Sequence, residues 1–103
     1  MKNVQRQEAR ALVTAVVLVR TESERVQDAA QAMLEIEGVT EVYSVTGPYD
    51  LVVMVRIPDF ERLAEIVPES LAQVPGVART ETMVAFRTYS NYDLDRIWSQ
   101  GFE

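Results

Sequence analysis

A repeated pattern divides the chain into two halves of the same design. Glu37-Gly38-Val39 recurs as Pro75-Gly76-Val77, and each copy follows an amphipathic stretch and precedes a strand-like run. Two copies of one supersecondary unit restrict the possible folds of so short a chain. The predicted order of elements is therefore strand, helix, strand, repeated once, which makes two β-α-β halves.

Four strand-like runs occupy the strand positions of this order. Residues 11–19 and 51–55 are β-branched and almost continuously apolar, which is typical of strands covered on both faces. Residues 39–46 and 77–88 mix polar and apolar side chains and predict more peripheral strands.

The first helix is expected after residue 21. Thr21 and Glu24 have the spacing of a capping box, and the apolar residues from Val26 to Leu34 recur at helical spacing. The helix is expected to end at Gly38, because glycine is common just after the last helical residue.

The second helix is expected to start at Asp59, which follows Pro58 and is a suitable N-cap. Pro68 interrupts its apolar stripe, because proline cannot donate the helical hydrogen bond to Ala64. The stripe continues beyond Pro68, so we expect a bend rather than two independent elements.

Right-handed crossovers in both halves place the two helices on one face of a four-stranded antiparallel sheet. This is an α+β fold, the ferredoxin-like βαββαβ arrangement. Residues 1–103 should form one domain with a core of about 11–88. The tail, 89–103, predicts a short helix from its apolar residues Tyr92, Leu94, Ile97 and Trp98.

Two helices cover only one face of such a sheet, yet the runs 15–19 and 51–55 place apolar side chains on both faces. The uncovered face would be larger than the apolar patch that monomers usually expose. We therefore expect a face-to-face homodimer with the association of a dimeric α/β barrel. The alternative is that the C-terminal tail folds over this face.

Composition excludes several classes of function. The chain contains no Cys and no His, which removes thiolate nucleophiles, imidazole bases and the usual zinc and haem ligands. We expect no cofactor and no metal. The formal charge of -6 argues against direct nucleic-acid binding. No apolar run suggests a signal peptide or a membrane span, so a cytoplasmic protein without membrane contact is expected.

Three stretches together resemble the ligand-binding domain of the Lrp/AsnC regulators, also called the RAM domain: Gly38-Val39, the turn 45–50 and the run 75–82. The resemblance covers roughly residues 12–88. It implies sheet-to-sheet dimers that form rings, such as octamers, and that bind amino acids where dimers meet. Only about eleven residues precede the first strand, where full-length regulators carry a helix-turn-helix domain, so the chain resembles the stand-alone members.

The turn between the second and third strands holds candidate effector contacts. Gly47 allows close approach of the backbone, Asp50 can face an ammonium group, and Tyr49 offers a ring with a polar tip. The resemblance adds Thr80 and Thr82 as hydroxyls of an effector-binding cleft. Each residue also has a structural interpretation: a hairpin turn, an Asp that bonds nearby amides, and ordinary strand threonines.

The leading hypothesis is a non-catalytic domain that binds a small amino-acid-like effector, oligomerises and acts as an accessory in transcription regulation. Full-length Lrp/AsnC regulators are candidate partners. Two alternatives share the topology: a small cofactor-free enzyme of the dimeric α+β barrel type, similar to a monooxygenase, and an ACT-like amino-acid-sensing domain. The geometry of the dimer would separate the ACT-like alternative.

Overall fold

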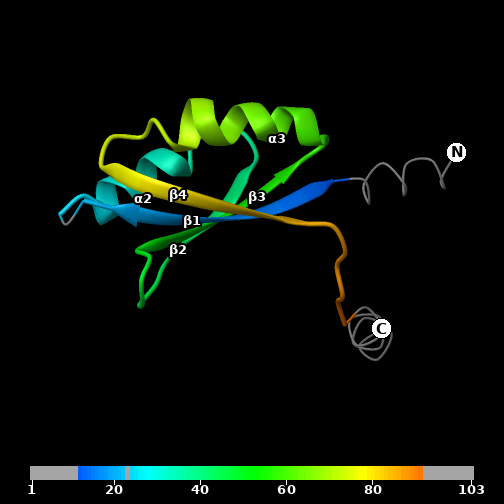
Figure 1. Cartoon of the computed structure of the whole chain (residues 1–103), viewed down its shortest axis with the longest axis horizontal. Coiled ribbons are helices and arrows are strands. Elements are labelled where there is room, and N and C mark those ends of the chain that lie inside the picture. Colours follow the sequence, from blue (N-terminus) through cyan, green and yellow to red (C-terminus); the bar gives the residue numbers. More distant parts are fainter. Residues whose placement is uncertain (1–11, 23, 92–103) are drawn as a thin grey trace, which may run out of the picture.

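The doubled pattern folds into a four-stranded sheet with its helices on one face (Figure 1). The computed structural model describes residues 12–22 and 24–91. The elements are β1 (Val13–Thr21), α2 (Val26–Met33), β2 (Val39–Ser44), β3 (Leu51–Ile57), α3 (Phe60–Ile66), the π-helical turn η1 (Val67–Leu71) and β4 (Val77–Ala85). The strand order is β2-β3-β1-β4, and every neighbouring pair is antiparallel. The predicted ferredoxin-like α+β fold is confirmed.

The core lies between the two central strands and the helices. Val17 of β1 pairs with Val53 of β3, and both are fully buried. Met33 of α2 and Leu71 of η1 cover them from the helical layer and are also fully buried. Each such side chain stabilises the fold by about 1.5–3 kcal/mol. The strong apolarity of the two central strands is explained by this position.

The capping box predicted for the first helix is wrong. Thr21 is the last residue of β1, and its backbone N–H donates to Oδ2 of Asp50 at 2.7 Å. Helix α2 begins only at Val26, after Arg25, which makes no side-chain capping bond. The strand continues further than the sequence predicted because Thr21 gains partners from β4 and from the β2–β3 hairpin.

The start and the interruption of the second helix are confirmed. Oδ1 of Asp59 accepts a hydrogen bond from the backbone N–H of Arg62 at 2.7 Å, which is the N-cap geometry. Pro68 lies in η1, where the α-helical hydrogen bonds give way to a wider turn closed by Ala72 N–H and the Val67 carbonyl at 2.9 Å. Because this turn accommodates the missing N–H, the helical path continues.

Strand β4 ends at Ala85, earlier than the predicted residue 88, and residues 86–91 form neither helix nor strand. Phe86 and Tyr89 are 94% and 86% exposed, so these two side chains pack against little in the described part of the chain. The helix predicted within 89–103 falls mostly on residues 92–103, outside the described residues.

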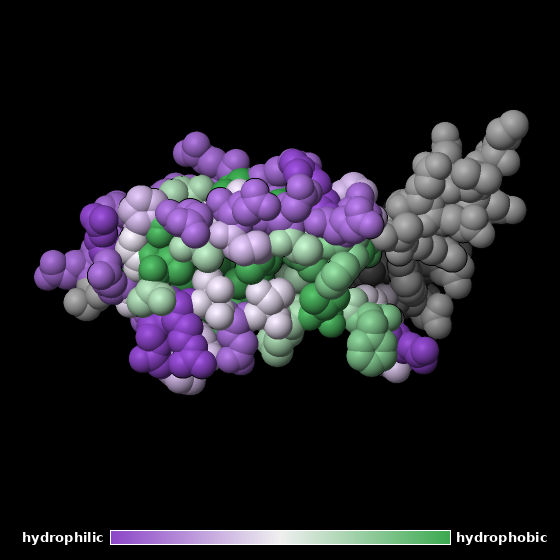
Figure 2. Space-filling model, turned by 45° about the horizontal axis from the view of Figure 1, so that its top comes forward, coloured by the Kyte–Doolittle hydropathy of each residue, from purple (hydrophilic) through white to green (hydrophobic). Residues whose placement is uncertain are grey.

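The helical layer has a hydrophilic outer surface. Figure 2 shows hydrophilic side chains over the helices and hydrophobic ones in a band below them. In the described ranges, no helix is long and apolar enough to cross a membrane.

Gly76 and Gly47 both lie in turns with a positive φ angle, but other atoms approach Gly76 much more closely than Gly47. Their φ angles are +95° and +110°, so another L residue is strained at either position. A Cβ at Gly76 would lie 2.6 Å from the Cβ of Arg25, whereas a Cβ at Gly47 would meet nothing within 4 Å. We expect Gly76→Ala to lower the free energy of unfolding by about 2–4 kcal/mol and Gly47→Ala by about 1–2 kcal/mol. Urea denaturation measures both values, and equal losses would contradict the close packing at Gly76.

Candidate functional site

The hairpin between β2 and β3 projects from the sheet on the side opposite the helices (Figure 1). Its base is closed by the hydrogen bond from Val45 N–H to the Asp50 carbonyl at 3.0 Å. A second bond, from Asp50 N–H to the Val19 carbonyl at 2.8 Å, fixes it to β1. The hairpin therefore has a defined position beside the uncovered face of the sheet.

Asp50 fastens this hairpin to the end of β1. Its Oδ2 accepts hydrogen bonds from the backbone N–H of Thr21 at 2.7 Å and from the Thr21 hydroxyl at 3.3 Å. Thr21 is only 8% exposed, so the carboxylate satisfies a donor that would otherwise be buried without a partner. In the described ranges Oδ1 of Asp50 accepts no hydrogen bond, and this oxygen remains available to a ligand.

Tyr49 reaches from the hairpin across the uncovered face to β4. Its hydroxyl donates to Oε1 of Glu81 at 2.8 Å. This bond raises the pKa of Tyr49, because ionisation would lose the bond and set a second negative charge beside Glu81. Partial desolvation adds to the rise, and the positive charges of Arg79 and Arg20 oppose it. Tyr49 is therefore a neutral donor that ties the hairpin to the sheet.

Gly47 forms the exposed tip of the hairpin. Its φ of +110° suits glycine, and no atom lies within 4 Å of the position that a Cβ would take. The following residue is also held, because a guanidinium nitrogen of Arg20 donates to the Pro48 carbonyl. The backbone at Gly47 is thus open to an incoming group while its neighbour is fixed.

Thr80 and Thr82 lie on the other face of the sheet. Thr80 pairs with Val19 and Thr82 with Val17, and both valines are fully buried under the helices. Cross-strand partners point to the same face, so the threonines point toward the helical layer. Because β4 is an edge strand, Thr80 is half-buried and Thr82 is exposed. One copy of the chain therefore does not gather all five predicted residues on a single surface.

Three residues near the hairpin were missed by sequence reasoning as members of the site: Thr21, Glu81 and Arg20. Their contacts with residues 48–50 span 28 to 32 positions along the chain. No local motif carries such a pairing. The signal that could have found them is the register of β1 with β3 and β4, which the sequence alone does not give.

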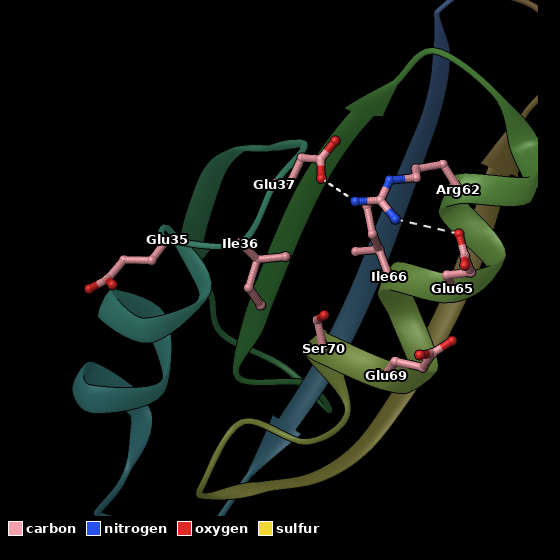
Figure 3. A pocket seen from close by; sticks show the side chains of 8 residues that line it. All are labelled: Glu35, Ile36, Glu37, Arg62, Glu65, Ile66, Glu69 and Ser70. Carbon is pink, nitrogen blue, oxygen red and sulfur yellow. Dashed lines mark hydrogen bonds and ion pairs between the residues drawn. The ribbon is translucent and has the colours of Figure 1, made fainter.

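A separate hollow lies between the end of α2 and the α3–η1 segment (Figure 3). Its lining residues are Glu35, Ile36, Glu37, Arg62, Glu65, Ile66, Glu69 and Ser70. Arg62 forms ion pairs with Glu37 and, at 3.4 Å, with Glu65. The bond to Glu37 is the main cause that raises the pKa of Arg62. Since its one cation is already paired, this acidic hollow is a poorer site for a zwitterion than the hairpin.

Among residues 12–22 and 24–91, no group of three or more acidic side chains is placed to hold a metal ion. The hairpin end of the sheet presents an open backbone at Gly47, an oxygen of Asp50 that accepts no hydrogen bond within the described ranges, and charged side chains nearby.

The fold is a βαββαβ arrangement of one sheet and one helical layer, in which the second face of the sheet is uncovered within the described part of the chain. The profile of the Lrp/AsnC ligand binding domain matches residues 14–94. The chain belongs to this family. The resemblance stated for the sequence is thereby confirmed.

Curated relatives place the domain within longer proteins. An uncharacterized HTH-type transcriptional regulator of Pyrococcus furiosus is 37% identical over 78 residues, which are 73% of this chain and 52% of the relative. The HTH-type transcriptional regulator FL11 of Pyrococcus abyssi is 31% identical over 73% of this chain and 49% of its own length. The chain thus spans about half the length of the curated relatives it matches.

Solved structures share the fold. The protein TTHA0845 of Thermus thermophilus is 49% identical, covers 77% of this chain and 99% of its own, and has a TM-score of 0.72. A transcriptional regulator of Neisseria meningitidis, solved as a complex with L-Met, is 15% identical over 77% of this chain and 53% of its own, with a TM-score of 0.69. The second likeness concerns the fold alone.

Proposed function

We propose that this chain is a non-catalytic domain that binds an amino acid or a similar small effector and links that binding to oligomerisation. The observation that carries the proposal is the hairpin 45–50, fixed beside an uncovered sheet with its Gly47 backbone open. The family is a ligand-binding one, and the L-Met complex of the Neisseria regulator supplies an example of the ligand class. Both favour this function over an ACT-like domain or a small monooxygenase.

The proposed effector contacts are Gly47, Tyr49 and Asp50 on the hairpin, together with Thr80 and Thr82 on β4. The hairpin and the threonines lie on opposite faces of the sheet within one copy. A complete site would therefore combine the hairpin of one copy with the threonines of another. This supports effector binding at a junction between copies.

The uncovered face of the sheet is the proposed dimer interface. Successive side chains along a strand point to opposite faces of the sheet, so every second one points away from the helices. The apolar side chains on this uncovered face are Val16, Leu18, Val52, Met54 and Met83. Met83 is 49% exposed in a single chain. Face-to-face pairing of two sheets would bury this surface. Dimers would then join into a ring, such as an octamer, at the junctions that hold the effector.

We further propose a role in transcription regulation. The curated relatives are HTH-type regulators in which a matching domain makes up about half of the protein. The chain would exert its effect through full-length Lrp/AsnC regulators rather than by contacting nucleic acid itself, since its net charge of -6 opposes a phosphate backbone.

A thermal-shift panel of the twenty amino acids tests the proposed function. A ligand present at a hundredfold excess over its dissociation constant adds about 2.7 kcal/mol of stability. We expect at least one amino acid to raise the melting temperature by about 10 °C or more under this condition. The control is the corresponding D-amino acid. Absence of any shift with all twenty, or turnover of a substrate, would contradict the proposal.

A further inference from the structure

Two arginines face each other at the hairpin end of the uncovered sheet face. Arg20 of β1 and Arg79 of β4 are direct cross-strand partners, and both are exposed. The Cβ atoms of such partners lie about 4.5–5.5 Å apart. Two like charges placed directly opposite each other destabilise an antiparallel pair. An arrangement that costs stability in the free protein is typical of a binding site.

Neither arginine forms an ion pair with a carboxylate of the described residues. Within residues 12–22 and 24–91, the only ion pairs are the two that Arg62 forms on the helical layer. Arg20 donates to the Pro48 carbonyl, a neutral acceptor, which leaves its positive charge without a carboxylate partner in these ranges. Two guanidinium groups without an ion-pair partner among the described residues thus stand together on a chain whose net charge is -6.

An acceptor for a positive group lies next to the pair. Glu81 follows Arg79 by two residues on the same face of β4, about 7 Å further along the strand. Its Oε1 accepts the hydrogen bond from Tyr49, and the positive charges of Arg79 and Arg20 act on the same phenol. Cationic and anionic groups therefore stand side by side beneath the hairpin, as the carboxylate and ammonium of an α-amino acid require.

We infer that Arg20 and Arg79 together bind the α-carboxylate of the amino-acid effector, with Glu81 beside them to receive its ammonium group. The inference rests on the proposed function and assigns to it residues that the sequence analysis did not name as effector contacts. A guanidinium binds a carboxylate through two parallel N–H···O bonds, whereas the ammonium group of a lysine offers no such planar pair of donors. Arginine side chains therefore suit this anion better than lysine side chains would. Arg20 is also fixed to the hairpin through Pro48, which links carboxylate binding to the position of Gly47.

Calorimetric titration of Arg79→Gln tests the inference. The probes are the amino acid that stabilises the wild type most in the thermal-shift panel and its carboxamide, which keeps the ammonium and the side chain but lacks the carboxylate. We expect the wild type to bind the amino acid at least tenfold more tightly than the carboxamide. Arg79→Gln should lose at least tenfold in affinity for the amino acid and little for the carboxamide. Arg79→Lys should show an intermediate loss.

Arg56→Gln is the matched control, because it removes one guanidinium from the same face at the other end of the sheet. Arg56 pairs with Thr14, six residues before Arg20 and about 20 Å away along β1. The Arg56→Gln variant should bind both probes with the affinity of the wild type. The melting temperature of ligand-free Arg79→Gln should stay unchanged or rise, since the mutual repulsion with Arg20 is removed.

Three outcomes would overturn the inference. One is unchanged affinity of Arg79→Gln for the amino acid while the wild type binds normally, which would leave the proposed function intact. Another is that Arg79→Gln binds the amino acid with unchanged affinity but forms a smaller assembly in light scattering. That result would mean that Arg20 and Arg79 bind a carboxylate of a second copy rather than the effector. If no amino acid binds the wild type at all, the inference fails together with the proposed function.

Discussion

Val16→Glu should convert the assembled protein into single chains. Val16 lies at the centre of the uncovered face, with Met54 and Met83 as its cross-strand partners. In a single chain the new carboxylate would reach water, because Val16 is only half-buried. Between two apposed sheets it would be an uncompensated buried charge, which costs about 3–5 kcal/mol. In a symmetric dimer the charge occurs twice, so association should weaken by more than about a thousandfold.

Light scattering coupled to gel filtration measures this change. Gln31→Glu is the control, because it adds the same charge on the exposed surface of α2 in the helical layer. It should leave the mass unchanged. Far-ultraviolet circular dichroism separates dissociation from unfolding, since Val16→Glu should keep its strands and helices. An assembly of unaltered mass in Val16→Glu would contradict the proposed interface.

Asp50→Ala should lose both stability and effector binding. The substitution removes the acceptor of two hydrogen bonds from Thr21, whose backbone N–H is buried at the end of β1. A buried donor without a partner costs about 1–3 kcal/mol. The hairpin would also be released from β1, so the backbone at Gly47 and the ring of Tyr49 would no longer hold their positions. Since each 1.4 kcal/mol of lost binding energy is tenfold, we expect about a hundredfold weaker binding of the amino acid.

Asp50→Asn separates the two roles of this carboxylate. The amide oxygen can still accept from Thr21, so most of the stability should remain. One of the two negative charges proposed to attract the ammonium, those of Asp50 and Glu81, is gone. Urea denaturation should show Asp50→Asn within about 1 kcal/mol of the wild type, and Asp50→Ala well below it. Calorimetric titration should show about a tenfold loss of affinity in Asp50→Asn. An Asp50→Ala protein that binds the amino acid like the wild type would remove Asp50 from the site.

The fold could be predicted because its determinants are local and repeated. The two Gly-Val copies mark the entries of β2 and β4, and the continuous apolar runs identify the central strands β1 and β3. The N-cap at Asp59 needs only the backbone three residues ahead. Such short-range features are visible in one sequence without any knowledge of tertiary contacts.

The errors arise where a distant partner changes the role of a residue. Thr21 and Glu24 have the spacing of a capping box, but Thr21 bonds with Asp50, 29 residues away, and remains in the strand. The register also sets Thr80 and Thr82 of β4 on the helical side, away from the hairpin of the same copy, and so decides that the predicted contacts would have to meet between copies. The opposition of Arg20 and Arg79 depends on the same register, which shifts at the irregularity after Arg20. A single sequence does not contain that register.

The mass of the wild-type protein in solution tests the central claim most directly. Sedimentation equilibrium over micromolar concentrations, without and with the amino acid that stabilises the protein most, reports how many chains associate. We expect at least two chains at every concentration, because the apolar face formed by β1, β3 and β4 has no cover within the described part of one copy. A single-chain mass across the whole range, with and without the amino acid, would contradict the account.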